Sequence, residues 1–242
     1  GEPDLELVGA VGHEKHLGED VGSLIGSEPV GVSLVGDLRK AISQSRAQVV
    51  VDFTNPGVVK QNLAIIAEER AHAVVGTTGI TEQDLPGIVT LYRQQGVSAV
   101  IAPNFAVGAA LLLRFAVQAA QFFPQVEIIE THHDQKLDAP SGTAIKYAEA
   151  IAQEVECTPS PTKVEKVVGA RGGELKGIKI HSLRLPGFVA HHSIVFGGLG
   201  QSLTLKHDSI SRESFVPGVI LAVRKVMDLD SVVYGLENLL DI

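Results

Sequence analysis

Three short, continuous apolar runs, separated by helix-type segments, limit most strongly what this chain can fold into. The runs are AQVVVDF at 47–53, AHAVV at 71–75 and VSAVIA at 97–102. They are unbroken rather than alternating, which is typical of strands buried on both faces of a parallel sheet. The order strand, helix, strand, helix, strand therefore predicts a Rossmann-like, doubly wound α/β sheet.

Each helix in this part of the chain has a recognisable start. Thr54 is the expected cap of the first helix, because Pro56 follows it at a position that suits the first helical turn. Thr81 is the expected cap of the second helix, at 82–95. A further strand is expected at 5–11, before the three runs.

The pattern changes after residue 103. A long apolar helix is expected at 105–123, a strand at 126–133 and a helix at 141–155, whereas the Gly-rich stretch 169–177 predicts a mobile loop. Three strand-type runs then follow without intervening helices, at 178–185, 188–196 and 202–207. We expect a second domain of α+β type with a four-stranded, mainly antiparallel sheet.

The expected domain boundaries follow from this change of pattern. Residues 1–103 and 215–242 are expected to form a domain whose doubly wound sheet suits dinucleotide binding, and residues 104–214 are expected to form the second domain. The segment 215–242 is included in the first domain because the apolar face of the helix expected at 211–227 would most simply pack back on that domain.

Charge and composition exclude several classes of function. The 242 residues carry a formal charge of −8, which gives no electrostatic reason to bind nucleic acid or an anionic membrane surface. The longest apolar stretches, such as 106–113, are too short to span a bilayer. Cys157 is the single cysteine, so the chain forms no internal disulfide and no cysteine-based zinc site. No metal site is proposed, and a reducing, cytoplasmic location is expected.

The densest polar segment is ETHHDQKLDAPSGTA at 130–144. It begins at the end of a strand and finishes at a helix start capped by Ser141, where unpaired N–H groups form an anion site. Lys136 adds a positive charge, and His132 and His133 can exchange a proton near neutral pH. Adjacent side chains on a strand point to opposite faces, so one histidine is expected to face the ligand. The alternative is an ordinary capped helix after a polar loop.

Two loops follow the second and third strands of the first domain. They are GTTG at 76–79 and APNF at 102–105. Ligands of doubly wound folds bind at such strand ends, and the two loops would lie side by side. Taken alone, four small residues after a strand are as often a structural turn.

These segments, together with RLPG at 184–187, closely resemble the dihydrodipicolinate reductase (4-hydroxy-tetrahydrodipicolinate reductase) family over nearly the whole chain. The resemblance implies reduction of 4-hydroxy-tetrahydrodipicolinate to tetrahydrodipicolinate by NADPH or NADH in diaminopimelate and lysine biosynthesis. It also implies a homotetramer built through the sheet of the second domain.

The resemblance also implies roles for individual residues. His132 would donate the proton and Lys136 would stabilise charge that develops on the substrate, a cyclic dicarboxylate. His133, Gly142 and Thr143 would hold its carboxylates. The residues implied to line the nicotinamide are Gly76, Thr77, Thr78, Ala102, Pro103, Asn104 and Phe105.

The chain departs from the family at its start. The family opens with a strand and a glycine-rich GxxGxxG turn, and the run at 5–11 matches the second strand instead, so we expect the natural N-terminus to lie upstream of Gly1. An organellar transit peptide upstream is the alternative to a cytoplasmic location. Where the family often places an acidic and a basic residue for the adenosine ribose, this chain reads Gly12-His13-Glu14-Lys15. We expect NADPH to be accepted at least as well as NADH.

Two other functions compete with this reductase. One is a catalytically impaired or non-catalytic ligand-binding homologue that lacks the glycine-rich cofactor turn. The other is a dehydrogenase of the same architecture with a different substrate. The histidines at 191 and 192 are expected to pack or to form hydrogen bonds within a strand, and Cys157 is not expected to be a nucleophile.

Overall fold

A computed structural model describes residues 2–12, 15–81 and 83–241. The chain forms two compact units. The first ends at Pro103 and also contains Ile220–Gly235. The second contains Asn104–Val219 and the C-terminal residues from Leu236 onward.

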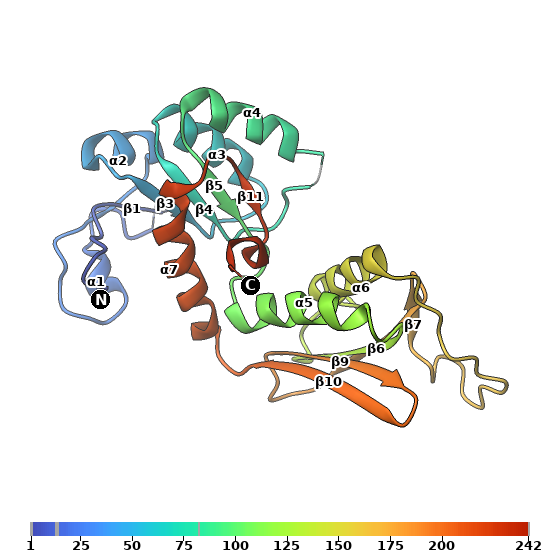
Figure 1. The fold of residues 1–242 in the computed structure, drawn as a ribbon. Coiled ribbons are helices and arrows are strands. Elements are labelled where there is room, and N and C mark those ends of the chain that lie inside the picture. The colour runs from blue at the N-terminus through green and yellow to red at the C-terminus, as the bar shows by residue number, and fades with distance from the viewer. Residues whose placement is uncertain (1, 13–14, 82, 242) are drawn as a thin grey trace. The chain divides into compact units, whose positions relative to one another are not determined.

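The first unit is built on a parallel sheet (Figure 1). Its four strands lie in the order β11-β5-β4-β3, with β3 at Val49–Asp52, β4 at His72–Val75, β5 at Ala99–Ile101 and β11 at Val233–Tyr234. Helix α2 at Leu38–Ser45 precedes β3, α3 at Val59–Glu68 connects β3 to β4, and α4 at Leu85–Gln95 connects β4 to β5. The predicted Rossmann-like arrangement is confirmed.

Packing between helices and sheet explains why the apolar runs of this unit are continuous. Ala73, Val74 and Val75 of β4 are all fully buried. Helices α3 and α4 are joined by the buried hydroxyl of Tyr92, which donates to the carbonyl oxygen of Leu63 at 3.0 Å. Burial raises the pKa of Tyr92 well above its usual value, so the hydroxyl keeps its proton.

The N-terminal part of this unit contains less strand than the sequence predicts. β1 covers only Ala10–Val11 of the run expected at 5–11. It pairs in parallel with β2 at Leu34–Val35 in a separate two-stranded sheet, and the short helix α1 lies between them at Val21–Leu24.

The two predicted helix caps are wrong. Helix α3 begins at Val59, five residues after Thr54, because the Thr54 hydroxyl is bound to Asp52 at 2.6 Å instead. Helix α4 begins at Leu85, because the Thr81 hydroxyl and N–H both bind the Asp84 carboxylate at 2.7 and 2.8 Å. The expected start of this helix at residue 82 lies outside the described residues.

The second unit contains a mixed sheet of five strands in the order β10-β9-β6-β8-β7. The strands are β6 at Gln125–His132, β7 at Gly173–Leu175, β8 at Ile178–Arg184, β9 at Ala190–Gly198 and β10 at Gln201–Ser209. All pairs are antiparallel except β6 with β8. The mainly antiparallel character is confirmed, but the expected count of four strands is wrong. Part of the stretch predicted to be a mobile loop forms β7 against β8.

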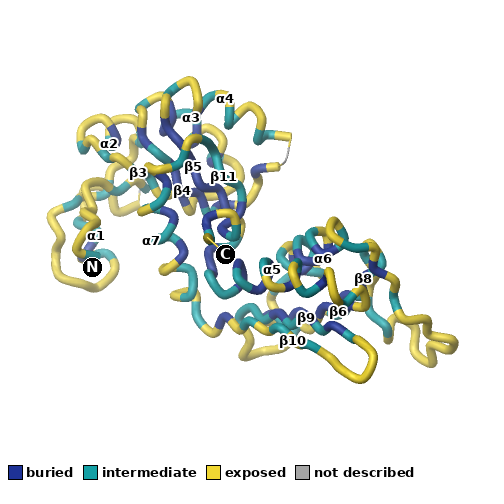
Figure 2. Tube along the Cα trace, in the orientation of Figure 1, coloured by how far each residue is buried: buried dark blue, intermediate teal, exposed yellow. Residues whose placement is uncertain are grey.

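One face of this sheet is covered by α5 at Val107–Ala120 and α6 at Gly142–Glu154 (Figure 2). Burial alternates along β6, so Ile128, Glu130 and His132 are buried on the covered face. Tyr147 of α6 is buried in the same core, and its hydroxyl donates to the carbonyl oxygen of Ala109 in α5 at 3.0 Å. The strand therefore places an acid and a histidine beneath the helices.

The C-terminal segment is divided between the units in a way that the expected boundary at 215 does not capture. The helix expected at 211–227 is a 3-10 turn at Arg212–Phe215, α7 at Val216–Lys225 and a second 3-10 turn, η2, at Val226–Asp228. Its first residues belong to the second unit, as does the 3-10 turn η3 at Leu236–Leu239. Within that unit, Glu237 forms an ion pair with Lys146 at 2.6 Å. No helix in the described parts of the chain is long and apolar enough to cross a membrane.

Two helical glycines give a matched test of this packing. A Cβ on Gly218 of α7 would lie 1.9 Å from the backbone oxygen of Phe105, whereas a Cβ on Gly87 of α4 would meet nothing within 4 Å. We expect Gly218→Ala to lower the free energy of unfolding by about 1–3 kcal/mol through overpacking. Gly87→Ala should raise it by about 0.4–1 kcal/mol, because alanine restricts the unfolded chain. Denaturant titration of both variants measures the difference, and equal effects would contradict the packing described.

Candidate active site

The polar segment between β6 and α6 forms a built site in the second unit. β6 ends at His132 and α6 begins at Gly142 after the N-cap Ser141, whose hydroxyl accepts from the N–H of Ala144 at 3.2 Å. Gly142 is exposed, and a Cβ there would meet nothing within 4 Å, whereas Thr143 is half-buried. The first turn of α6 is thus open to an anion.

The two adjacent histidines have different environments. His132 is only 8% exposed, whereas His133 is exposed. The Nδ1 atom of His132 is hydrogen-bonded to the carboxylate of Glu130, two residues earlier on the same face of β6. The structure therefore gives one of the two histidines a fixed partner.

Glu130 is completely buried, and its carboxylate is hydrogen-bonded by several groups. Besides His132, both terminal nitrogens of Arg184 donate to its carboxylate, at 3.0 and 2.8 Å, and the N–H of Ser141 donates to it at 3.3 Å. Burial alone would raise the pKa of Glu130, but the hydrogen bonds from His132 and Arg184 outweigh it and hold the pKa well below its usual range. The carboxylate is therefore ionised.

Lys136 lies in the loop between the strand and the helix. Its Nζ atom is 2.7 Å from a carboxylate oxygen of Asp138. The hydrogen bond from Lys136 lowers the pKa of Asp138 from its usual value. The carbonyl oxygen of Asp138 accepts from Arg184 at 2.6 Å, so this loop is attached to the arginine that also holds Glu130.

His192 of β9 is buried next to His132, with ring centres 5.4 Å apart in an edge-to-face arrangement. Its Nε2 atom is hydrogen-bonded to the Ser141 hydroxyl at 3.2 Å, and the oxygen of that hydroxyl also accepts from the N–H of Ala144. Burial lowers the pKa of His192 to about 3, and the neighbouring His132 adds to this effect. His192 is therefore neutral and hydrogen-bonded, as expected. No cluster of His, Cys, Asp and Glu side chains suited to a metal ion occurs among the described residues.

The second group of predicted site residues lies at the carboxyl ends of β4 and β5 in the first unit. β4 and β5 are neighbours, and the N–H of Ala102 donates to the carbonyl oxygen of Val75 at 2.9 Å. Gly76 and Ala102 thus follow adjacent strands, as the sequence predicts. Asn104 and Phe105 belong to the second unit.

The loop after β4 owes its shape to two glycines. A Cβ on Gly76 would lie 2.2 Å from the ring of Phe53, and Gly79 has a φ of +100°, which side-chain-bearing residues rarely adopt. Between them, Thr77 is buried with its hydroxyl 3.3 Å from the Asp52 carboxylate, whereas Thr78 is exposed. Of these residues, Thr78 offers an accessible side chain.

The loop after β5 also contains both buried and exposed residues. Ala102 and Phe105 are buried and Pro103 is exposed. Asn104 is half-buried, and its side-chain oxygen accepts from the N–H of Ala106 at 2.9 Å. Any cofactor here would meet Pro103 and exposed backbone rather than the side chains of Ala102 or Phe105.

Comparison with known proteins agrees with this arrangement. Residues 1–105 match the family description "Dihydrodipicolinate reductase, N-terminus", and residues 108–240 match "Dihydrodipicolinate reductase, C-terminus". The chain belongs to the dihydrodipicolinate reductase family. The expected membership is confirmed.

Individual relatives of the family are similar over almost their whole length. The 4-hydroxy-tetrahydrodipicolinate reductase of Moorella thermoacetica is 50% identical over 240 residues, which cover 98% of this chain and 89% of that protein. The reductase of Desulfitobacterium hafniense is 49% identical, with 98% and 90% covered. A dipicolinate-bound dihydrodipicolinate reductase structure from Paenisporosarcina sp. TG-14 has a TM-score of 0.88 at 42% identity, with 99% of this chain and 91% of that chain covered.

A more distant structure shows the fold alone. The amine dehydrogenase of Mycobacterium smegmatis has a TM-score of 0.66 at 12% identity, with 96% of this chain and 88% of that chain covered. This likeness supports the general architecture of a dehydrogenase and carries no information on the substrate.

Sequence reasoning missed three residues at the two candidate sites. Glu130 stands at the start of the polar segment, and the signal that identifies it is strand alternation, which places it on the same face as His132. Arg184 was noted as part of RLPG, but its contact with Glu130 depends on the pairing of β6 with β8. Phe53, 52% exposed at the end of β3, carried no motif.

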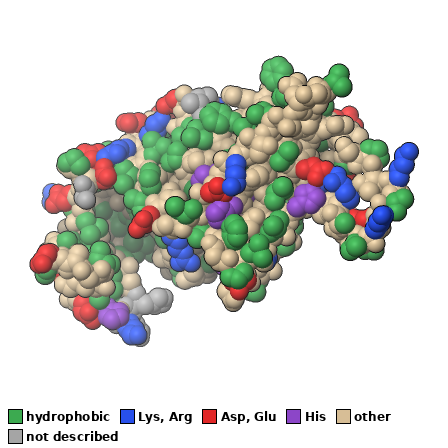
Figure 3. Space-filling model, turned by 90° about the horizontal axis from the view of Figure 1, so that it is seen from below, with side chains coloured by type: hydrophobic (Ala, Val, Ile, Leu, Met, Phe, Trp, Pro, Cys, Tyr) green, Lys and Arg blue, Asp and Glu red, His purple; other side chains and the backbone are tan. Residues whose placement is uncertain are grey.

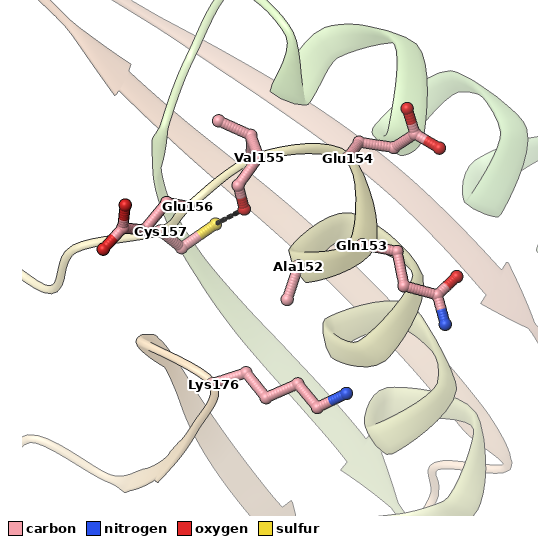
Figure 4. Close-up of a pocket in the computed structure, with 7 residues that line it drawn as sticks. All are labelled: Ala152, Gln153, Glu154, Val155, Glu156, Cys157 and Lys176. Atoms are coloured by element: carbon pink, nitrogen blue, oxygen red, sulfur yellow. Dashed lines mark hydrogen bonds between the residues drawn. The ribbon is translucent and has the colours of Figure 1, made fainter.

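A hollow lies at the C-terminal end of α6, away from the candidate site at the start of this helix (Figure 4). Its lining residues are Ala152, Gln153, Glu154, Val155, Glu156, Cys157 and Lys176. Burial raises the pKa of the Cys157 thiol, whose sulfur lies 3.7 Å from the carbonyl oxygen of Val155. A raised pKa favours the unreactive thiol, which agrees with the expectation that Cys157 is not a nucleophile.

The buried, neutral His192 predicts an acid-sensitive fold. The unfolded chain takes up a proton at this residue below about pH 6.5, whereas the folded chain does so only near a pH of about 3. The free energy of unfolding therefore falls as the pH falls through this interval. We expect His192→Gln to make the fall between about pH 6.5 and 5 shallower, before Glu130 titrates in the unfolded chain. Denaturant titration at several pH values measures the slope, and identical slopes would refute the effect.

Proposed function

We propose that this chain catalyses the reduction of 4-hydroxy-tetrahydrodipicolinate by a pyridine nucleotide. The observation that carries the proposal is the arrangement around the end of β6. An acid, a cation and an open helix N-terminus all occur between His132 and Thr143, and family membership supports the same reaction. The alternative of a non-catalytic ligand-binding homologue rests on the missing glycine-rich turn, and the retained His132 and Lys136 speak against it.

The substrate is a dicarboxylate, and the start of α6 suits one of its carboxylates. The N–H groups of Gly142 and Thr143 lie in the first turn, where backbone donors and the helix dipole favour an anion. The absence of a side chain at Gly142 lets the carboxylate approach the backbone. His133 is exposed on the loop side of the same strand end and would contribute a further contact.

His132 and Lys136 would divide the chemistry. In the net reaction the substrate loses its hydroxyl group together with a ring hydrogen as water and the ring gains a hydride, and one proton then neutralises the negative charge left on the reduced ring. His132 would hold this proton on Nε2, because its Nδ1 is engaged by Glu130. Lys136 would stabilise the negative charge that develops on the ring during reduction.

The loops at the ends of β4 and β5 would hold the nicotinamide part of the cofactor. A pyridine nucleotide supplies the hydride when bound. The residues fit a flat ring, since both strand ends carry small residues and the exposed Phe53 and Pro103 offer apolar surface at the ends of β3 and β5. Gly76, Thr77, Thr78, Ala102, Pro103, Asn104 and Phe105 remain the proposed lining.

Replacing His132 and Lys136 should separate their roles. We expect His132→Ala to lower kcat by roughly 10²- to 10⁴-fold and to affect substrate KM less, because it removes a positioned proton donor. Lys136→Ala should raise KM and lower kcat together, since its charge meets the substrate before and during the reaction. Steady-state kinetics with product detection measures both effects.

Lys179→Ala is the matched control for the lysine. Lys179 also forms an ion pair, with Glu174 at 2.9 Å, and its side chain is 19% exposed against 21% for Lys136. It should keep wild-type kinetics. Turnover by His132→Ala at the wild-type rate would remove this residue from the mechanism, and no turnover by the wild-type protein would refute the proposed function.

Cofactor choice is predicted from the residues after β1. Gly12 lacks a carboxylate that would repel a 2′-phosphate, and Lys15 is exposed, whereas His13 lies outside the described residues. We expect kcat/KM with NADPH to equal or exceed that with NADH. Lys15→Ala should reduce kcat/KM for NADPH more than for NADH. A strong preference of the wild-type protein for NADH would contradict this assignment.

The outer face of the second-unit sheet bears on the assembly of the chain. The face of the second-unit sheet opposite α5 and α6 carries exposed apolar side chains, including Ile129 and Leu183, each 38% exposed. Figure 3 shows charged and histidine side chains among hydrophobic ones when the molecule is seen from below. Such a face suits contact with further copies of the chain, which supports a homotetramer. A cytoplasmic location also remains a prediction.

A further inference from the structure

Glu130 is the buried group on which several parts of the candidate site converge. Its carboxylate is fully buried and contacts His132, Arg184 and Ser141, which come from three different elements. Because one of these contacts is with the proposed proton donor, the buried charge does more than hold the fold together. In the proposed reaction this carboxylate only occupies Nδ1 of His132, and its contacts with Arg184 and Ser141 have no role there.

We propose that Glu130 is the positioning residue of the active site, which fixes the tautomer of His132 and joins the proton donor to the substrate-binding loop and helix. This inference rests on the proposed function and adds a residue to it. Glu130 would not touch the substrate, and it would act through His132.

The tautomer follows from the chemistry of the contact. An ionised carboxylate only accepts hydrogen bonds, so the Nδ1 atom of His132 must carry the hydrogen that joins it to Glu130. In the protonated ring the second hydrogen then sits on Nε2, which is the atom free of this contact. The negative charge of Glu130 also stabilises the positively charged ring, which is the form able to donate a proton.

Arg184 extends this control to Lys136. The two terminal nitrogens of the guanidinium bind Glu130 as a fork, and one of them also donates to the carbonyl oxygen of Asp138 at 2.6 Å. Asp138 holds Lys136 through its carboxylate. The loop that carries the cation is therefore tied to the carboxylate that orients the acid.

Ser141 extends the same control to the anion site. Its N–H donates to Glu130, and its hydroxyl caps α6 through the N–H of Ala144. The first turn of the helix, with Gly142 and Thr143, is thereby fixed relative to His132. One carboxylate thus determines the relative positions of proton donor, cation and anion site.

The other charged or titratable groups that contact this site do not supply a negative charge to the His132 ring. Arg184 from β8 is bound to Glu130 itself, and His192 from β9 is neutral and hydrogen-bonded to the Ser141 hydroxyl. Among the described residues, the ring of His132 therefore has one anionic partner, Glu130. Removing that charge should remove both the partner of the positively charged ring and the acceptor that fixes its tautomer.

Glu130→Gln tests the inference with a side chain of the same size. The amide would present its NH₂ group to Nδ1, or would leave Arg184 facing a donor, so the orientation of His132 is lost either way. We expect kcat to fall by roughly 10²- to 10⁴-fold with a smaller change in substrate KM. The alkaline limb of the kcat profile, where the acid loses its proton, should move to lower pH.

Two further variants separate positioning from folding. Glu130→Asp keeps the charge on a shorter side chain, so it should restore the position of the alkaline limb and part of kcat. Glu127→Gln is the matched control, because Glu127 lies on the opposite face of β6 and is also bound by an arginine and a histidine, Arg171 and His181. It should leave kcat and the pH profile unchanged.

A measurement without turnover distinguishes this inference from the proposed function. Nitrogen chemical shifts of the His132 ring, observed by NMR in the intact wild-type protein, report which ring nitrogen carries the hydrogen. We expect an Nδ1–H tautomer, whether or not the chain reduces the proposed substrate. An Nε2–H tautomer in the wild-type protein would overturn the inference, and so would a Glu130→Gln variant with wild-type kcat at every pH. If Glu130→Gln does not fold, the ring shifts and Glu130→Asp decide the matter.

Discussion

The arrangement of the second unit around the candidate site depends on the buried carboxylate of Glu130. This carboxylate requires a positive charge and hydrogen-bond donors at fixed positions around it. A carboxylate removed from water is tolerated only when its oxygens are paired, and breaking such a pair costs about 3–5 kcal/mol. Glu130 meets this requirement through Arg184, which comes from β8, and through Ser141 at the start of α6. The register of β6 with β8, which pairs His132 with Arg184, is the arrangement that brings the guanidinium to the carboxylate. The register of β6 and β8 therefore pairs the buried carboxylate, and this ion pair in turn stabilises the register.

The same interaction explains how much of this site the sequence could predict. The strand, the capped helix and the polar residues between them are local, so their order and the N-cap Ser141 follow from residue spacing alone. Arg184 lies 54 residues beyond Glu130. Its partner depends on β6 and β8 running in parallel beside each other, and no local pattern indicates such a pairing. Residue spacing thus indicates the proposed acid and the proposed cation, but not the carboxylate that we propose orients them.

The errors in the first unit have a related cause. Thr54 and Thr81 have the right chemistry for helix caps, but each is captured by a nearby carboxylate, Asp52 and Asp84 respectively. Ser, Thr and Asp side chains compete for the same backbone and hydroxyl partners, so a helix start shifts by several residues when a second acceptor is close. The strand β7 was missed for the opposite reason. Its residues have weak strand character, and pairing with β8 rather than propensity makes them extended.

The proposed cofactor loops show what a motif of small residues does and does not specify. Thr77 and Ala102 are buried, and their polar groups are engaged within the first unit, by Asp52 and by Val75. Gly76 is confined by the ring of Phe53, so the loop after β4 is shaped by packing against the loop after β3. These residues hold the strand ends in place, and the surface they create consists of backbone and of the exposed Thr78, Pro103 and Phe53. A surface of this kind suits the flat face of a ring better than a charged group. The charged chemistry of the chain is concentrated instead around Glu130, where burial makes each charge-assisted hydrogen bond stronger than it would be in water.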